Sequence, residues 1–394
     1  ALAVLLFAIS EISGVTFTLP NVTIPPKGYL VIAKNMTNLF AKYPNLNSGN
    51  TVGNYSGKLS HNGELLVLSQ PETLNTNTAI LVEEDQVAYG TGGRWGEWSD
   101  GDGSSLELID SHSNHRLAAN WADSDDISKS VWTNITYTGV LDNGANYESG
   151  ILHAQMGLLD DGECLVDNIQ VNYNGNNYVS NGTFESGTSG WSFQGCMTRS
   201  SLETPGYQSS YALHIRASDQ LWPGDNSCQV ALNANPLASG QTVTLSYAAR
   251  WLHGNNEAQL RLNGNWLEAV GELPVPNNLG SPGMPNSTYI TNAGPAIYNV
   301  THNPPVPAAN QPVVLTANVC DPDGVANLTL YYRLDPATSY TAVPMKDDGT
   351  GGDAVPGDGV FNATIPGQAA NQIVAFYISA TDGLGAAARF PALR

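Results

Sequence analysis

The chain has no long apolar run and few basic residues. No stretch of about 18 or more consecutive apolar residues occurs, so no segment is expected to cross a membrane as a helix. The 394 residues include 15 Lys or Arg and 35 Asp or Glu, which gives a formal net charge of −20. A field of this sign repels phosphate polymers and anionic lipid surfaces. We therefore expect neither nucleic acid nor a bare membrane as a partner.

Cysteine is also scarce. None of the four cysteines forms a CxxC pair, which argues against a structural zinc site or a thioredoxin-like centre. An even number of cysteines in a chain that looks extracellular allows disulfides. We favour a bridge between Cys196 and Cys228, because both lie in the same predicted sandwich. A bridge between Cys164 and Cys320 would have to join two domains, and the alternative that all four are buried thiols stays open.

Familiar catalytic motifs are absent from the sequence. It contains no HExxH, no GxSxG, no Walker loop and no GxGxxG after a predicted strand. Acidic pairs such as Asp160 and Asp161 are too common in this chain to nominate a glycosidase pair. We therefore expect a protein that is not an enzyme.

Glycine and proline, by contrast, are abundant, with 40 and 23 residues. They punctuate short runs of Val, Thr, Tyr, Ile and Leu that often alternate with polar residues. Alternation with a period of two indicates strands, and long helical periodicity is almost absent. The length suits several domains of ordinary size. We predict an all-β protein built from three β-sandwich domains in series.

Residues Ala1 to Ile9 form an unbroken apolar run, ALAVLLFAI. The run is too short to span a bilayer and too apolar to be left in water, so something must cover it. Three interpretations stay open: a core strand of its own domain, a strand donated to a neighbouring molecule, or the remnant of a secretory signal, which no basic residue precedes. A donated strand would link molecules head to tail into a fibre. Its assembly contacts would come from Ala1, Val4, Leu5, Leu6, Phe7 and Ile9.

The first predicted domain comprises residues 1–126. Pro25–Ala33 reads as a turn that feeds a strand, and Tyr55–Leu68 reads as an Asn-Gly hairpin followed by a strand. With the later segments Gly103–Leu108 and Asn120–Trp121, this order of motifs resembles the lamin-tail domain of bacterial secreted and surface proteins. The resemblance implies an immunoglobulin-like sandwich without catalytic residues. The family's opening strands are not visible here, and the open edge this implies favours a donated strand.

The second predicted domain comprises residues 127–280. Val179–Gly187, followed by Gly190 and Trp191, resembles the start of the jelly rolls of bacterial carbohydrate-binding modules. Tyr211–Ile215 and Val243–Trp251 match later strands of that pattern. The resemblance implies a β-sandwich built for packing or for ligand display.

A Pro- and Gly-rich linker is predicted over residues 281–294, because its composition cannot hold a strand. The third predicted domain comprises residues 295–394 and shows clear alternation, as in Val313, Leu315, Ala317 and Val319. It resembles a bacterial Ig-like or fibronectin-III-like module.

Carbohydrate binding needs exposed aromatic platforms beside polar side chains. In the second domain, Trp191 and Trp251 lie in strand-like motifs and are expected in the core. Trp222 lies in the sequence Leu-Trp-Pro-Gly-Asp, which reads as a loop, and it is the candidate carbohydrate-binding residue.

Calcium is the most plausible cofactor. Asp347, Asp348, Asp353 and Asp358 fall in one Gly-rich loop, where several carboxylates can converge on one hard ion. Their spacing does not match an EF-hand. Asp and Gly are also the ordinary residues of tight turns, so a turn without a metal is the alternative.

Asn-x-Ser/Thr triplets are frequent and fit an extracellular or cell-surface protein, although a chain so rich in Asn, Ser and Thr generates several by chance. The candidate glycosylation sites are Asn21, Asn35, Asn54, Asn134, Asn181, Asn286, Asn299, Asn327 and Asn362.

The sequence as a whole predicts a non-enzymatic extracellular protein with a structural or adhesive role. Its partners would be further copies of itself, assembled into a surface fibre, or cell-surface glycans. The alternatives are a carbohydrate-binding module protein and the accessory region of a larger cell-surface enzyme.

Overall fold

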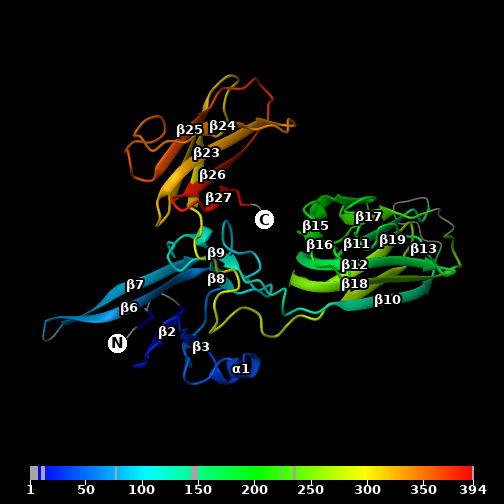
Figure 1. The fold of residues 1–394 in the computed structure, drawn as a ribbon, viewed down its shortest axis with the longest axis horizontal. Coiled ribbons are helices and arrows are strands. Elements are labelled where there is room, and N and C mark those ends of the chain that lie inside the picture. Colours follow the sequence, from blue (N-terminus) through cyan, green and yellow to red (C-terminus); the bar gives the residue numbers. More distant parts are fainter. Residues whose placement is uncertain are drawn as a thin grey trace. The chain divides into compact units, whose positions relative to one another are not determined.

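The structure is a computed structural model that describes residues 8–9, 14–75, 78–142, 150–222, 224–233 and 237–392. The regular structure is nearly all strand, and the described residues contain one short α-helix and two short 3-10 helices. The chain forms two compact units: unit 1 contains residues 1–96, 106–123 and 281–394, and unit 2 contains residues 97–105 and 124–280. The predicted all-β class, built from β-sandwich packing, is confirmed (Figure 1).

The N-terminal part of unit 1 is built on an antiparallel sheet in the order β5-β2-β1-β6-β7. Its strands are β1 (Ala8–Ile9), β2 (Val15–Thr18), β5 (Ser56–Gly57), β6 (Glu64–Asn75) and β7 (Thr78–Tyr89). The Asn-Gly hairpin predicted before β6 does not form. Its first strand, β5, pairs with β2, whereas β6 pairs with β1 and β7.

Part of the apolar N-terminal run lies inside this sheet. Ala8 and Ile9 pair with Thr18 and Phe17 of β2 on one side and with Ser69 and Leu68 of β6 on the other. Both edges of β1 are therefore paired with strands of the same chain. This agrees with the interpretation that the run is a strand of its own domain. This pairing gives no support to the predicted fibre. The other residues of the predicted assembly strand, Ala1, Val4, Leu5, Leu6 and Phe7, lie outside the described residues.

The remaining elements of this part are short. They are β3 (Val31–Ala33), α1 (Met36–Lys42), β4 (Thr51–Gly53), β8 (Leu106–Leu108), the 3-10 helix η1 (Ala118–Asn120) and β9 (Trp121–Asp123). β3 and β4 form a parallel pair, and β8 and β9 an antiparallel one. Helix α1 begins at Asn35, whose side chain accepts a hydrogen bond from the backbone N–H of Asn38 at 2.9 Å, as a good N-cap does.

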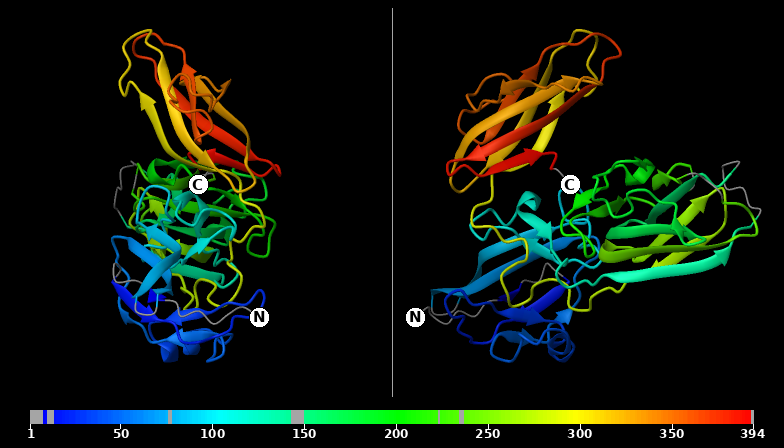
Figure 2. Two further views of the ribbon diagram at one scale, coloured as in Figure 1. Left: turned by 90° about the vertical axis from the view of Figure 1, so that its left-hand side faces the viewer. Right: turned by 45° about the vertical axis from the view of Figure 1, so that its right-hand side comes forward.

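The C-terminal part of unit 1 is a β-sandwich (Figure 2). One sheet contains β21 (Ala296–Asn303), β22 (Val313–Cys320) and β25 (Val360–Ile365), and the other contains β23 (Val325–Leu334), β24 (Thr341–Pro344), β26 (Val374–Asp382) and β27 (Ala387–Phe390). The alternating residues Leu315, Ala317 and Val319 face Leu330 and Ile378 in one apolar core. Alternation with a period of two thus places one face of each strand inside.

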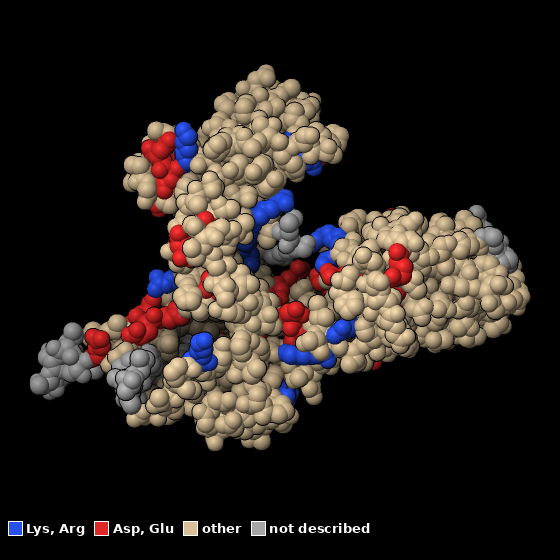
Figure 3. All heavy atoms as spheres, viewed as in Figure 1, with Lys and Arg blue, Asp and Glu red and all other residues tan. Residues whose placement is uncertain are grey.

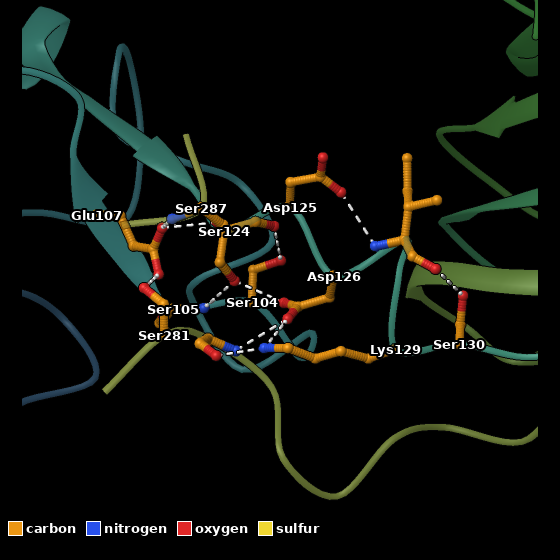
Figure 4. Close-up of polar contacts among 12 residues, drawn as sticks. Ser104, Ser105, Glu107, Ser124, Asp125, Asp126, Lys129, Ser130, Ser281 and Ser287 are labelled. Carbon is orange, nitrogen blue, oxygen red and sulfur yellow. Dashed lines mark hydrogen bonds and ion pairs between the residues drawn. The ribbon is translucent and has the colours of Figure 1, made fainter. Parts of the chain in front are cut away.

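The segment predicted as a linker packs along unit 1 through a buried carboxylate. Glu107 is 4% exposed and accepts hydrogen bonds from Ser281 Oγ at 2.5 Å and from the N–H and Oγ of Ser287, both at 2.7 Å (Figure 4). Asn286 adds a hydrogen bond from its amide to the carbonyl oxygen of Leu108 at 2.9 Å. Proline and glycine prevented a strand here, and side-chain hydrogen bonds to β8 hold the segment instead.

Unit 2 consists of two sheets, each called here by a residue that it carries. The Tyr247 sheet has the order β10-β18-β12-β16-β15, with β13 paired to β12, and the Gln155 sheet has the order β14-β17-β11-β19-β20. The strands of the Tyr247 sheet are β10 (Thr133–Val140), β12 (Gly162–Tyr173), β13 (Asn176–Asn177), β15 (Ser201–Glu203), β16 (Ala212–Ala217) and β18 (Thr242–Gly254). Those of the Gln155 sheet are β11 (His153–Leu158), β14 (Trp191–Gln194), β17 (Ser227–Ala231), β19 (Glu257–Asn263) and β20 (Glu268–Glu272), and the 3-10 helix η2 (Gly195–Met197) follows β14.

The two sheets enclose one large apolar core. Leu245 and Tyr247 of β18 pack in the same cluster as Met156 of β11 and Leu260 of β19. Two tryptophans predicted to be core residues are confirmed as such, since Trp191 is 8% and Trp251 1% exposed. The hydroxyl of Tyr247 donates a 2.6 Å hydrogen bond to the carbonyl oxygen of Ala258 and lies 3.3 Å from the carbonyl oxygen of Ala269, so polar contacts cross the apolar interior.

A second buried carboxylate secures the ends of unit 2. Asp126 is 1% exposed and accepts hydrogen bonds from Ser124 Oγ at 2.6 Å, Lys129 Nζ at 2.8 Å and the backbone N–H of Gly280 at 2.9 Å (Figure 4). Lys129 also donates to the carbonyl oxygen of Gly280. A buried charge is stable when it is paired and fully hydrogen-bonded. Asp126 thereby joins the two ends of residues 124–280, the longer segment of unit 2.

The predicted disulfides are not supported, because all four cysteines are free thiols. Cys196 Sγ donates to the carbonyl oxygen of Asp219 at 3.2 Å, whereas Cys228 Sγ donates to Ser200 Oγ at 3.6 Å. Burial raises the pKa of the Cys228 thiol to about 12, so it stays protonated. Cys164 is buried in the same core, and the alternative of thiols without bridges describes this structure. Within the described ranges no helix is long and apolar enough to cross a membrane.

Replacing Tyr247 with Phe should lower the free energy of unfolding by about 1–2 kcal/mol, because the carbonyl oxygen of Ala258 loses a buried hydrogen bond while the ring still fills the core. Denaturant titration followed by tryptophan fluorescence measures this. The control is Tyr137→Phe at a residue that is 51% exposed, where a change within about 0.5 kcal/mol is expected. Equal losses in the two variants would contradict the role given to the Tyr247 hydroxyl.

A charged cluster lies on the outer side of the Tyr247 sheet. His214 is 6% exposed, and its ring nitrogens lie 2.8 Å from Glu163 Oε2 and 3.2 Å from Glu203 Oε1. Burial opposes ionisation of Glu163, but the hydrogen bond and charge of His214 and the charge of Arg216 outweigh it, so the pKa of Glu163 lies below its usual 4.5. The ionised carboxylate therefore stabilises the folded state above pH 4.5, and this contribution is lost as the pH falls through the lowered pKa.

Replacing Glu163 with Gln should destabilise the protein at neutral pH and flatten the fall of stability below about pH 4.5, because the variant has no proton to take up at this position. Urea titrations at several pH values between about 3 and 7 measure the slope. Glu272→Gln, at an exposed position, is the matched control and should leave the slope unchanged. An unchanged slope in Glu163→Gln would remove the cluster as a source of acid sensitivity.

Candidate functional site

The side of the Gln155 sheet that faces away from the core is polar. Strands β11 and β19 alternate between core residues, such as Met156 and Leu260, and polar residues that point the opposite way. Gln155, Gln229, Arg261 and Glu268 lie directly opposite one another across β17, β11, β19 and β20. With their neighbours on β19 they form what we call the polar face: Gln155, Gln229, Gln259, Arg261, Asn263 and Glu268.

Two small hydrogen-bond networks occupy this face. On one side, the amide nitrogen of Gln155 donates to Gln229 Oε1 at 3.1 Å and lies 3.4 Å from Ser227 Oγ. On the other side, the amide nitrogen of Gln259 donates to Glu268 Oε2 at 2.7 Å. The face therefore holds planar amide groups whose orientation is set by their neighbours.

Several polar atoms between these networks lack a hydrogen-bond partner although they are buried. They are Oε1 of Gln155, Nε and Nη2 of Arg261, and Oδ1 of Asn263. Gln155 is fully buried, Asn263 is 3% exposed and Arg261 is 5% exposed. Buried polar atoms normally find partners, and each one left without a partner costs about 1–3 kcal/mol. A ligand with hydroxyl groups would supply both donors and acceptors to these atoms.

Exposed tryptophans lie beyond the two ends of the central strand β11. Trp266, in the turn between β19 and β20, is 58% exposed, and this turn follows Asn263, which pairs with His153 at the start of β11. Trp222, in the loop before β17, is 45% exposed, and its neighbour Leu221 donates to the carbonyl oxygen of Leu158 at the end of β11. Six residues of strand span about 20 Å. Exposed indole rings are not used by the core and are free to stack on a ligand.

Few charges cover unit 2 on the side drawn in Figure 3. In that view its surface is mostly neither acidic nor basic, whereas acidic groups gather on the β6–β7 hairpin of unit 1. Within the polar face itself, amides outnumber charged groups, since Arg261 and Glu268 are its two ions and they lie 3.5 Å apart. A neutral, hydroxyl-rich ligand therefore meets little electrostatic cost on this face.

Comparison with protein families supports this view of unit 2. Residues 176–268 match the family described as a carbohydrate binding domain. The carbohydrate binding domain begins at β13 and ends at Glu268, the first residue of β20, so it includes β17, β19 and the loops that carry Trp222 and Trp266. The comparison with curated proteins gave no match. The lamin-tail-like and Ig-like resemblances in unit 1 stay predictions.

Sequence reasoning located Trp222 but missed the polar face. The exposed loop position of Trp222 agrees with the prediction, while its role in binding stays a prediction. The signal for the face was present in β19, where Glu257, Gln259, Arg261 and Asn263 alternate with apolar residues. That pattern predicts that one side of β19 is polar. It does not indicate that this side is buried, or that Gln155 of β11 and Gln229 of β17 lie beside it.

The Asp-rich loop of unit 1 brings together three of the four carboxylates proposed for calcium. Ligand atoms of Asp347, Asp353 and Asp358 all lie within 4.8 Å of one another, whereas Asp348 is not part of the group. Asp347 accepts hydrogen bonds from the N–H groups of Gly357 at 2.5 Å and Gly359 at 2.9 Å, so the carboxylates also shape the loop. The Thr350 hydroxyl lowers the pKa of the exposed Asp348.

Some of the candidate glycosylation sites have their amides engaged. Asn362 is 8% exposed, and its amide nitrogen donates to the carbonyl oxygens of Lys346 at 3.1 Å and Thr350 at 2.7 Å. The amide nitrogen of Asn181 donates to the carbonyl oxygen of Gly187 at 2.8 Å. A glycan on either amide would have to replace these hydrogen bonds.

Proposed function

We propose that the protein binds carbohydrate through the polar face of the Gln155 sheet and the exposed tryptophans beyond its two ends. The observation that carries the proposal is the match of residues 176–268 to a carbohydrate binding domain, because the matched segment contains β17, β19 and Glu268, which supply five of the six residues of the polar face. The unpartnered atoms of Gln155, Arg261 and Asn263 add independent support.

The chemistry of the face suits sugars. A sugar ring has apolar C–H faces that stack on indole rings, and its edges carry hydroxyl groups that both donate and accept hydrogen bonds. Gln155 and Gln229 offer amides held in place by one another, and Gln259 is held by Glu268. Groups that are already oriented lose little conformational entropy when a ligand binds.

We place this function outside the cell, where carbohydrate binding domains typically act. The role is adhesive: unit 2 attaches the chain to a polysaccharide or to cell-surface glycans. The proposed activity is carbohydrate binding without a chemical reaction.

Replacing Trp222 or Trp266 with Ala should each weaken polysaccharide binding by about tenfold, because a stacking surface is lost without a change in the core. Screening the full chain on a glycan array, followed by affinity electrophoresis in gels that contain the polysaccharides it selects, measures this. Tyr289→Ala removes an equally exposed aromatic residue from unit 1, at 45% exposure, and should leave affinity unchanged. Absence of binding to every glycan and polysaccharide tested would refute the proposal.

We also propose that the loop of residues 347–358 binds calcium, supported by the approach of Asp347, Asp353 and Asp358 to one another. Oxygen ligands from several carboxylates suit this hard ion. Unit 1 would then gain stability on binding, since a ligand that binds only the folded state shifts unfolding to higher temperature.

Calcium added after chelation should raise the melting temperature of the wild-type protein, and Asp358→Asn should reduce that rise. An asparagine side chain can still accept the hydrogen bond from Val360 N–H, so the variant removes the charge while keeping the turn. Asp348→Asn, in the same loop but outside the cluster, is the control and should behave as the wild type. If calcium titrated into the chelated protein releases no heat in isothermal calorimetry and leaves the melting temperature unchanged, the calcium site is excluded.

A further inference from the structure

Arg261 carries a buried positive charge whose hydrogen-bonding capacity is only partly used. Its Nε and Nη2 have no hydrogen-bond partner, and the residue is 5% exposed. Glu268 Oε1 lies 3.5 Å from Nη2, and the other oxygen of that carboxylate already accepts from Gln259 at 2.7 Å. Burial lowers the pKa of the Arg261 guanidinium, which the charge of Glu268 opposes. The charge of Glu268 therefore offsets only part of the cost of burying the Arg261 guanidinium.

The two unused donors form one recognition edge. Nε–H and the N–H of Nη2 on the same side lie in the guanidinium plane and point in parallel, the arrangement that binds both oxygens of a carboxylate. A single hydroxyl oxygen can reach both donors only through bent hydrogen bonds, whereas the two oxygens of a carboxylate match their parallel directions and also carry the opposite charge. The geometry of the vacant edge therefore favours a carboxylate over a hydroxyl group.

The groups around this edge have the opposite preference. Gln155 lies directly across from Arg261 on β11, and Asn263 lies two positions further along β19. Their unpartnered atoms, Oε1 and Oδ1, are acceptors, so they require donors such as hydroxyl groups. The polar face thus has one place for a carboxylate and several places for hydroxyls.

We propose that the polar face recognises a polysaccharide in which isolated uronic acid residues occur along a mainly neutral chain, with one uronate carboxylate bound to Nε and Nη2 of Arg261. The inference rests on the proposed carbohydrate-binding function. A fully charged polyuronate is a poorer ligand, because the net charge of −20 repels it and the face offers a single cation. The alternative is that Nε or Nη2 of Arg261 donates a hydrogen bond to Oε1 of Gln155, which would use the same donors without a ligand.

The test compares each uronate-bearing polysaccharide with the same polymer after chemical reduction of its carboxyl groups to primary alcohols. This pair keeps the backbone and most hydroxyls and removes only the anion. Affinity of the protein for both forms is measured by affinity electrophoresis and calorimetry. Carboxyl reduction should weaken binding by about tenfold, the loss expected for a charge-assisted bidentate contact.

The protein side of the test uses Arg261→Gln and Arg261→Lys. The Gln variant should bind the uronate form about as weakly as the wild type binds the reduced form, and carboxyl reduction of the polymer should change the affinity of this variant by less than about twofold. The Lys variant keeps the charge but not the parallel donors, so its affinity for the uronate form should also fall. Arg333→Gln removes another arginine that pairs with a carboxylate, Asp335 at 2.7 Å in unit 1, and should change neither affinity. Melting curves establish that the variants fold.

The possible outcomes separate the two proposals. Equal wild-type affinity for the uronate and reduced forms would overturn the uronate inference and leave carbohydrate binding intact. The inference would also be overturned if Arg261→Gln lost the same factor of affinity for the uronate form and for the reduced form. Arg261 would then contact hydroxyl groups or hold Gln155 in place. No binding to any polysaccharide would remove the proposed function and the inference with it. If Arg261→Gln does not fold, the comparison of the two polymer forms with the wild-type protein still decides.

Discussion

Burial of Leu245, Tyr247 and Trp251 against Met156 and Leu260 decides which way strands β18, β11 and β19 of unit 2 face. Because successive side chains of a strand point to opposite sides, placing one set in the core forces the intervening set outward. On β11 and β19 that second set is Gln155, Gln259, Arg261 and Asn263. The polar face is therefore a consequence of how the apolar core is packed, and the hydrogen bond from Tyr247 to Ala258 ties its sheet to the opposite one.

The unpartnered buried atoms of the polar face lower the stability of unit 2, and this loss is an argument for a ligand-binding role. A domain that needed only stability would fill such positions with residues that are fully hydrogen-bonded or apolar, since unpaired buried polar atoms lower stability. Unit 2 instead keeps unpartnered atoms on Gln155, Arg261 and Asn263 side by side on one sheet. Arg261 and Asn263 lie in the segment that matches a carbohydrate binding domain, and Gln155 on the preceding strand β11 pairs with it, so the proposed carbohydrate ligand would complete these hydrogen bonds.

Buried carboxylates perform a different task in both units, namely holding segments that have no strand partners. Asp126 joins the two ends of residues 124–280 in unit 2 through Ser124, Lys129 and Gly280, and Glu107 holds residues Ser281 and Ser287 along β8 in unit 1. Composition alone marked the region after residue 280 as a linker because Pro and Gly exclude strands there. It did not indicate that the linker would be hydrogen-bonded to an acidic side chain far away in the sequence.

Local pattern was enough to predict the strands and the core residues that alternate along them. The all-β class, the core positions of Trp191 and Trp251, the exposure of Trp222 and the jelly-roll resemblance of the second domain all follow from alternation, Gly and Pro punctuation and short motifs. Tertiary structure decided what depends on contacts between distant residues: that β5 pairs with β2 and not β6, that the cysteines stay free, and that Gln155 lies across from Arg261. Period-two alternation is a local property of the chain, whereas pairing register and burial on the outer side of a sheet are set only when separate strands meet.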